Sequence, residues 1–219
     1  PLEDFDKLAI AGEIDFQSVS LDEKDFEPRI ENLNGKIIYT HTPEVAQRKS
    51  EPWIRILQYK NLSGNFSNSK FTDLNGELGL SNGEPMERAT ALYHLDASDL
   101  HWMIEEDSKD ALLVLQEGLD FTSGSVLINY RFEENPEKPE TEKEWGKIEL
   151  KNLAMKYHDR LQAMTRLNGN ISYDDEKIRL ENVMGRYGDS SLHLEGEIDR
   201  RDVSNPDFSL RLNLPEFLN

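Results

Sequence analysis

The feature that most constrains this chain is an alternation of apolar and polar residues with a period of two. Residues 208–214 read Phe-Ser-Leu-Arg-Leu-Asn-Leu, and residues 192–199 read Leu-His-Leu-Glu-Gly-Glu-Ile-Asp. The same alternation recurs in residues 14–16, 19–21, 126–132, 148–150, 171–173 and 178–180. Because successive side chains of a strand point to opposite faces, the apolar side chains share one face of a sheet. Parallel sheets show continuous apolar runs instead, so we expect a mainly β fold with an antiparallel sheet.

Turn and helix signals fill the spaces between these segments. Turns are predicted at Asn34-Gly35, Ser63-Gly64, Asn75-Gly76, Asn82-Gly83, Asn168-Gly169, Asp174-Asp175 and residues 204–206. A short helix is expected over 99–106 with Ser98 as its N-cap, and a second over 108–117. The polar stretches 44–52 and 133–144 are expected to be solvated loops.

Composition excludes several function classes. The 219 residues include no cysteine, which excludes disulfides, thiolate metal sites and cysteine nucleophiles. The 43 acidic and 25 basic residues give a formal net charge of −18, which argues against nucleic-acid partners and against docking on an anionic bilayer. No segment approaches the roughly 20 apolar residues of a membrane helix. We therefore expect membrane contact only through parts outside this segment.

Motifs for catalysis or metal binding are weak. The five histidines lack metal-ligand spacing, and we expect them to be surface or internally satisfied residues, with His193 facing water between Leu192 and Leu194. Asp159 and the acidic run 174–176 could be calcium ligands, but a turn is the favoured interpretation. The chain has no nucleophile elbow, P-loop or dinucleotide fingerprint. We predict no catalytic residues, no metal and no cofactor; abundant carboxylates and three tryptophans alone would motivate a carbohydrate-active enzyme.

An internal repeat emerges when short anchors are aligned. Residues 33–37 match 167–171 at a shift of 134, and residues 62–66 match 183–187 at 121. Two further matches join 74–78 to 194–198 at 120, and 95–100 to 212–217 at 117. Extra loop residues in the first copy, including 44–52, would explain the falling shift. The chain begins at Pro1 without Met, and we expect a fragment of a longer repeat protein with repeats 1–118 and 119–219, the second incomplete.

Residues 167–214 carry a resemblance to a known family. They contain Leu167/Gly169/Ile171, an acidic turn, Ile178/Leu180, Val183/Gly185/Gly188, Leu192/Leu194/Gly196 and a Pro-led strand from Pro206 to Leu214. This order of elements resembles the repeating unit of the bacterial AsmA-like superfamily, which includes AsmA, TamB and YhdP. Residues 12–100 fit more loosely, because the 44–52 insertion and the Ser67-Asn68-Ser69 turn depart from the pattern.

The resemblance implies a segment of a periplasmic, inner-membrane-anchored protein of the Gram-negative envelope. Such a segment guides acyl chains of phospholipid or a similar lipid between inner and outer membrane and contributes to outer-membrane biogenesis; other envelope proteins are possible partners. Independently, glycines at strand ends allow bulges that curl a sheet into an open gutter. The predicted groove lining is Ile14, Phe16, Ile128, Tyr130, Ile171, Tyr173, Ile178, Leu180, Leu192, Leu194, Ile198, Phe208, Leu210 and Leu212.

Two alternatives stay open at this stage. From pattern alone, the same apolar residues suit the sealed core of a β-sandwich or barrel. In function, the alternative to a lipid groove is a β-repeat module that binds another envelope protein through its edges, with the acidic surface steering a basic partner.

Overall fold

A computed structural model describes residues 9–23, 26–41, 55–81, 84–103, 119–134, 143–157, 162–202 and 205–214. The fold is mainly β, as predicted. The strands are β1 (Ile10–Glu23), β2 (Phe26–His41), β3 (Arg55–Phe66), β4 (Ser69–Ser81), β5 (Glu84–Asp96), β6 (Leu119–Glu133), β7 (Lys143–Tyr157), β8 (Met164–Tyr173), β9 (Lys177–Tyr187), β10 (Ser190–Asp199) and β11 (Asp207–Asn213).

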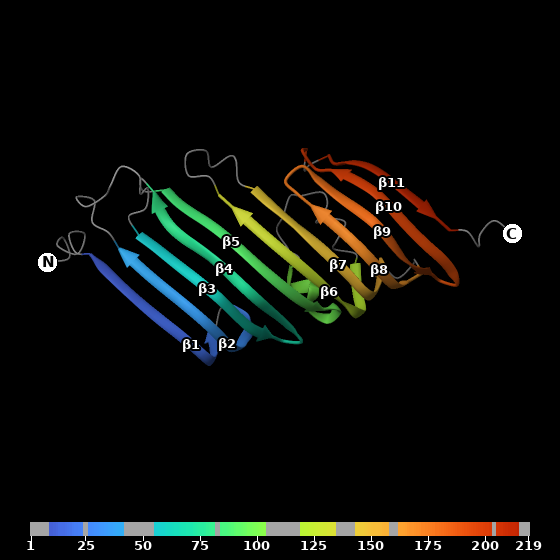
Figure 1. Cartoon of the computed structure of the whole chain (residues 1–219). Helices are drawn as coiled ribbons and strands as arrows, with labels where there is room; N and C mark the ends of the chain where they lie inside the picture. The colour runs from blue at the N-terminus through green and yellow to red at the C-terminus, as the bar shows by residue number, and fades with distance from the viewer. Residues whose placement is uncertain are drawn as a thin grey trace. The chain divides into compact units, whose positions relative to one another are not determined.

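The described strands form one curved, open antiparallel sheet of eleven strands in the order of the chain, β1 to β11. β1 and β11 are its two edges, so the strands do not close into a barrel, and no second sheet among the described residues opposes this one. The chain divides into two compact units, which are described separately. Unit 1 comprises Pro1–Leu92 and Tyr130–Lys143, and unit 2 comprises Tyr93–Asn129 and Glu144–Asn219. Within each unit, strands that follow one another in the chain lie side by side in the sheet (Figure 1).

Several predicted turns lie inside strands. Asn34-Gly35, Ser63-Gly64, Asn75-Gly76 and Asn168-Gly169 all fall within strands, so the turn predictions there were wrong. Asp174-Asp175 does join β8 to β9, as predicted. Asn82-Gly83 lies outside the described residues, as does Ser204 of the 204–206 turn. These Asn-Gly pairs therefore do not end strands.

Bulges stand where the turns were expected. Seven non-glycine residues inside strands have φ near +50°, namely Ser18, Asn32, Asn61, Asp73, Asn152, Arg166 and Asn182. The pairing register shifts at these positions, which defines β-bulges. A Val or Leu follows each of them directly. A bulge adds one residue, so Leu180 and Val183 share a face although they are three residues apart. Aligned bulges bend neighbouring strands at the same level, and this bends the sheet.

The bulges also show how the internal repeat is built. The Gly12/Tyr39 and Gly146/Tyr173 pairs are equivalent at a shift of 134, and β3 is equivalent to β9 at 121. The difference of 13 residues equals the connection 42–54 between β2 and β3, which includes the predicted insertion. The shift in residue number then decreases from 121 to 120 at Asp73, because β4 has a bulge there that β10 lacks. Equivalent strands are thus six apart.

The fourth predicted anchor is wrong. A Cβ added to Gly76 would meet the carbonyl oxygen of Arg88 at 2.1 Å, and one added to Gly196 would meet that of Ser209 at 2.1 Å. Arg88 and Ser209 therefore occupy equivalent positions, at a shift of 121. The match of Leu95 with Leu212, at 117, joins non-equivalent positions, because the similarity of two Leu-led segments does not determine the register of the strands that contain them.

The short helix differs from its prediction in type and cap. Residues 97–103 form a 3-10 helix, η3 (Ala97–Met103). Asp96 caps it: its Oδ1 accepts hydrogen bonds from the Ser98 backbone N–H (2.9 Å) and hydroxyl (2.6 Å), which lowers the pKa of Asp96. Residues 104–118, including the second predicted helix, lie outside the described residues, as do 44–52 and 135–142. The predicted loop 133–144 is too long, because Glu133 ends β6 and β7 begins at Lys143.

Candidate functional site: the apolar face of the sheet

In unit 2, strand pairing places the apolar side chains on one face. Ile198 lies opposite Ile178 and Phe208, and Leu194 lies opposite Val183 and Leu212. The face, called the apolar face, continues through β8 and β7, where Ile171 pairs with Ile148. Its members in unit 2 are Ile148, Leu150, Leu153, Leu167, Ile171, Tyr173, Ile178, Leu180, Val183, Leu192, Leu194, Ile198, Phe208, Leu210 and Leu212.

Unit 1 has an equivalent apolar face. Ile14 pairs with Ile37, and Ile37 pairs with Tyr59. Tyr39 pairs with Leu57, which in turn pairs with Leu78. The apolar face of unit 1 contains Ile14, Phe16, Val19, Leu33, Ile37, Tyr39, Leu57, Tyr59, Leu62, Leu74 and Leu78. The repeat therefore conserves this face between the two copies, strand by strand.

Glycines on the apolar face are covered by neighbouring side chains. A Cβ added to Gly76 would meet the Tyr59 ring at 2.6 Å, and one added to Gly146 would meet the Tyr173 ring at 2.7 Å. Each aromatic ring thus lies over the glycine of a neighbouring strand. A ring in this position fills the space above the backbone, so the face is continuous rather than pitted.

Burial changes along the apolar face. Side chains beside the bulges are the most buried, with Leu167 2% and Val183 3% exposed. Towards the strand ends and the edge strands the face is open: Ile14 is 58%, Leu78 42%, Leu210 44% and Leu212 56% exposed. All seven residues of β11 are exposed. The apolar face therefore has a buried line at the bend and an accessible surface beside it.

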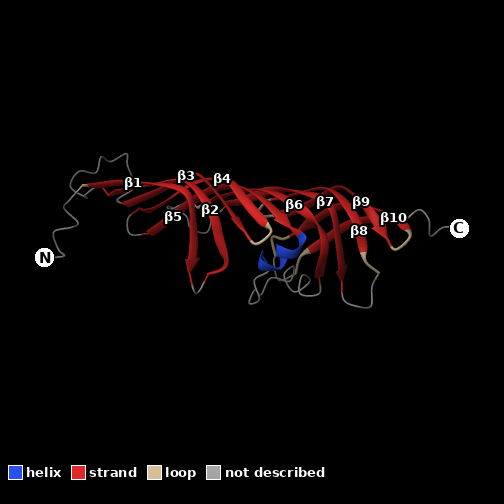
Figure 2. Ribbon diagram, turned by 90° about the horizontal axis from the view of Figure 1, so that it is seen from below, coloured by secondary structure: helices blue, strands red, loops and turns tan. Residues whose placement is uncertain are grey.

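The helix η3 covers part of this face in unit 2. It lies beneath β6 and β7 (Figure 2), and Ala97 and Leu100 are buried. Val126 and Ile128 of β6 are buried as well. In the described part of unit 2, the exposed side chains of the apolar face are therefore Phe208, Leu210 and Leu212 of β11, while those of β9 and β10 are buried or half-buried.

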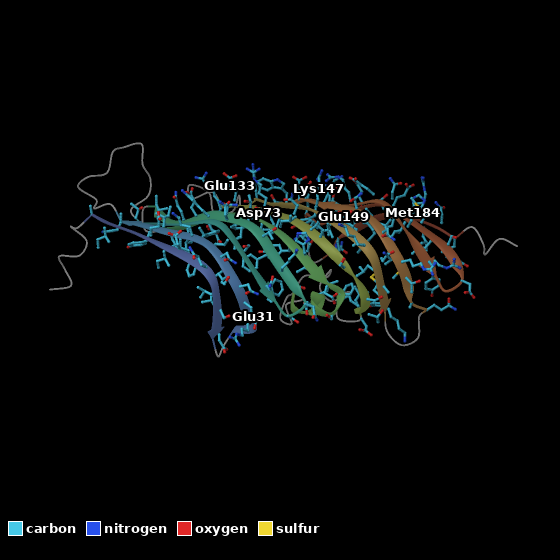
Figure 3. All side chains as sticks on the ribbon, turned by 60° about the horizontal axis from the view of Figure 1, so that its bottom comes forward. Glu31, Asp73, Glu133, Lys147, Glu149 and Met184 are labelled. Atoms are coloured by element: carbon cyan, nitrogen blue, oxygen red, sulfur yellow. The ribbon has the colours of Figure 1, made fainter. Side chains whose placement is uncertain are left out.

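The opposite face, called the polar face, carries the charges. In unit 2, Lys147 and Glu149 pair with Ser172 and Asn170, on the side of the ribbon away from η3 (Figure 3). In unit 1, Lys36 contacts Glu13 at 2.5 Å and Asp15 at 3.5 Å, which raises the pKa of Lys36. Met184 is an exception, an exposed apolar side chain beside His193 on the polar face. The two faces thus differ sharply in chemistry.

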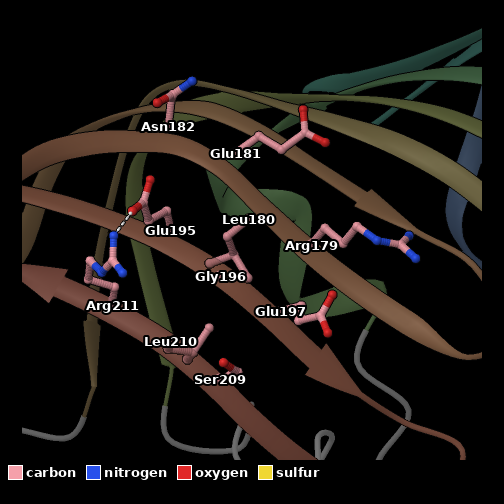
Figure 4. Close-up of a pocket in the computed structure, with 10 residues that line it drawn as sticks. All are labelled: Arg179, Leu180, Glu181, Asn182, Glu195, Gly196, Glu197, Ser209, Leu210 and Arg211. Atoms are coloured by element: carbon pink, nitrogen blue, oxygen red, sulfur yellow. Dashed lines mark hydrogen bonds and ion pairs between the residues drawn. The ribbon is translucent and has the colours of Figure 1, made fainter.

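A depression on the polar side of β9, β10 and β11 is a weaker candidate for a site. Its lining residues are Arg179, Leu180, Glu181, Asn182, Glu195, Gly196, Glu197, Ser209, Leu210 and Arg211 (Figure 4). Arg211 contacts Glu195 at 3.0 Å, and Arg179 contacts Asp174 at 2.9 Å, which lowers the pKa of Asp174. Both guanidinium groups are already paired with carboxylates. The depression therefore offers no free cation to a ligand.

The predicted groove residues divide by accessibility. Ten of the fourteen lie on the apolar face of unit 2 by register, and Ile14 and Phe16 lie on that of unit 1. Ile128 and Tyr130 lie two apart on β6 and so share a face of that strand. Leu192 and Ile128 are buried, at 4% and 8% exposure, so they pack against neighbouring side chains and are not accessible to a ligand.

Sequence reasoning missed the structural role of three asparagines. Asn34, Asn75 and Asn168 each accept a backbone N–H bond from the bulge residue of the preceding strand. The sequence signal for this role is the Leu-Asn-Gly tripeptide, which occurs three times and whose composition predicts a turn. The histidines also differ from expectation. His41 is buried, and among the described residues the Nδ1 atom of its ring has no hydrogen-bond partner; His193 lies on the polar face but is half-buried, and its Nε2 atom likewise has no partner there.

The site residues define a class by structure alone: an open, single-layer antiparallel β repeat with one apolar and one charged face. No protein-family model, curated protein or solved structure matches this chain. In the described ranges no group of three or more His, Asp and Glu side chains could hold a metal ion. The described helix is too short to cross a membrane.

Proposed function

We propose that the chain is a non-enzymatic lipid-transport segment whose apolar face binds acyl chains and lets them slide along the sheet. The observation that carries this proposal is the apolar face itself, which is accessible at Leu78 in unit 1 and at Leu210 in unit 2. Leu78 lies on β4, in the interior of the sheet, so its exposure is not an edge effect. Exposed apolar area of this kind marks a binding surface.

The energetics favour a hydrocarbon ligand. Burying a Leu or Ile side chain contributes about 1.5–3 kcal/mol, and a half-exposed one can gain roughly half of that. Several such residues in line give a chain of methylene groups a binding surface without any single deep pocket. The energy is similar at each position because the repeat presents the same face on equivalent strands. A ligand can therefore move along the sheet without a large barrier.

On the basis of the resemblance to the AsmA-like superfamily, we propose that this function is carried out in the periplasm by a protein anchored in the inner membrane. Lipid head groups would remain in water, and the charged polar face would keep the sheet soluble. No bond is made or broken in this mechanism.

Lipid mass spectrometry of the purified chain, alone and within its full-length protein, tests the proposal. We expect copurifying lipid with the wild type and its loss with Leu210→Arg, which places a charge on the apolar face. Ser209→Arg is the matched control, because it adds the same charge one residue away on the polar face. Lipid retention that is equal in the two variants would contradict the proposal.

A second candidate function rests on the sheet edges. Among the described strands, β1 and β11 each have one unpaired side, and a strand of another protein can add to such an edge. This is the binding-module alternative. A salt-sensitive protein partner recovered without lipid, and lost when proline is introduced into β11, would support it over the lipid groove.

A further inference from the structure

Charged residues border the apolar face of unit 2 at the start of β7, at the turn between β8 and β9 and directly after β10. Glu144 stands two residues before Gly146, and Arg200 stands two residues after Ile198, so both continue rows of the apolar face. The Glu144 backbone N–H donates to Asp175 Oδ1 at 2.6 Å, and the Arg200 N–H donates to the Glu176 carbonyl at 2.7 Å. These bonds place the four residues side by side. We call Glu144, Asp175, Glu176 and Arg200 the rim.

The rim holds charges of both signs that are not neutralised pairwise. Arg200 is half-buried, and its Nε atom is buried without a hydrogen-bond partner among the described residues. Glu144 is half-buried, and burial raises the pKa of its carboxyl, while the charge of Arg200 opposes that shift. Desolvated charges of this kind gain most from a ligand that pairs with them. Arg201 lies near Glu176 but is already paired with Asp199, so the three carboxylates and one guanidinium leave the rim negative overall.

The fold does not require these charges. At a shift of 134, Ile10 occupies the position of Glu144 in unit 1, and His41 occupies that of Asp175. Both units keep the same strand pairing and the same apolar face with different residues at this level. The rim is therefore an addition to the repeat, and its desolvated Glu144 stands where the equivalent strand has an apolar side chain.

We propose that the rim binds the head group of a zwitterionic phospholipid, with the carboxylates contacting its ammonium group and Arg200 contacting its phosphate. This inference rests on the proposed function, because the acyl chains of the same lipid lie on the adjoining rows that end at Ile198 and Phe208. An anionic head group without an amine meets three carboxylates and one guanidinium, so it binds less well. The rim thus gives the apolar face a preference among lipids with identical chains.

Calorimetric titration of the full chain with two soluble lipids tests the proposal. The probes are dihexanoyl-phosphoethanolamine and dihexanoyl-phosphoglycerol, which have the same acyl chains. We expect the amine-bearing lipid to bind about fivefold more tightly at low salt, the effect of one partly exposed charge contact. In Glu144→Gln/Asp175→Asn/Glu176→Gln the ratio falls to about one, and in Arg200→Gln both lipids bind more weakly.

The control is Glu195→Gln/Arg211→Gln, which removes a charge pair from the polar face of the same strands and leaves the ratio unchanged. Equal binding of the two lipids by the wild type overturns the rim proposal while the lipid-binding face stands. Absence of binding for both lipids overturns the rim proposal together with the proposed function. Circular dichroism of each variant verifies that the sheet is intact.

Discussion

The side-chain oxygen of Asn168 accepts a hydrogen bond from the backbone N–H of Asn152 at 3.0 Å, across the pair β7 and β8. Its amide group donates to the carbonyl oxygen of Arg166 at 2.8 Å. Both partners are bulge residues with φ near +50°. Asn34 makes the same two bonds to Ser18 and Asn32, and Asn75 makes them to Asn61 and Asp73. Each Leu-Asn-Gly therefore fastens two adjacent bulges together.

Replacing Asn168 with Ala should lower the free energy of unfolding by about 1–2 kcal/mol, because two backbone groups lose their partner. Asn168→Asp keeps the acceptor and loses the donor, so an intermediate loss is expected. Asn170→Ala, on the same strand and exposed on the polar face, is the control and should change stability by less than about 0.5 kcal/mol. Urea unfolding measures all three. Equal effects of Asn168→Ala and Asn170→Ala would show that the two hydrogen bonds of Asn168 contribute nothing to stability.

Gly169 should not tolerate a side chain. Its φ is +150°, and an added Cβ would meet the Asn182 carbonyl oxygen and the Val183 Cα, each at 2.7 Å. Gly169→Ala should therefore destabilise the protein by about 2 kcal/mol or more. Gly12→Ala, where nothing lies within 4 Å, should be neutral or slightly stabilising. Thermal unfolding of the two variants gives the comparison, and similar melting temperatures would contradict the close packing at Gly169.

Glu144→Gln should stabilise the protein at neutral pH. Burial raises the pKa of Glu144 above its ordinary value of 4.5, so the ionised carboxylate is less favourable in the folded than in the unfolded chain. This cost is present above the folded pKa and disappears as the pH falls to 4.5. The gain in melting temperature is thus expected at pH 7 and absent at pH 4. A variant less stable than the wild type at pH 7 would show that Glu144 is instead held by its attraction to Arg200.

The buried line and the open part of the apolar face should respond differently to truncation. Leu167→Ala should cost about 2–5 kcal/mol, because Leu167 is almost fully buried beside its bulge. Leu212→Ala should cost less than about 1 kcal/mol, since that side chain is more than half exposed. Denaturant unfolding with both variants tests the division. A large loss from Leu212→Ala would mean that this part of the face is covered in solution.

The alternation of residue types was sufficient to predict the sheet, its antiparallel pairing and its two chemically distinct faces. It could not locate the strand ends, because Leu-Asn-Gly has the composition of a turn while its Asn and Gly serve a bulge inside a long strand. In β9, the alternation changes phase by one residue between Leu180 and Val183, and this change is the sequence signal of the bulge between them. Two alternating segments that are offset by an odd number of positions, with Asn or Gly between them, therefore indicate one bent strand rather than two strands joined by a turn.

The rim was beyond sequence reasoning for a related reason. Glu144 stood in a predicted acidic loop, and only the register of β7 with the 174–176 turn brings its backbone to Asp175. Long-range pairing of this kind depends on the number of residues in each bulge and turn. The same holds for the fourth repeat anchor, where a four-residue error in register looked like continuing similarity.

Photo-cross-linking along the strands β10 and β11 tests the central claim most directly. A benzophenone side chain at Leu194 or Leu210 lies on the apolar face, while one at His193 or Arg211 lies on the polar face of the same strands. With the full-length protein in cells, we predict lipid adducts at Leu194 and Leu210 and none at His193 and Arg211. Protein adducts alone at Leu210, or lipid adducts at equal yield on both faces, would contradict an acyl-chain-binding face.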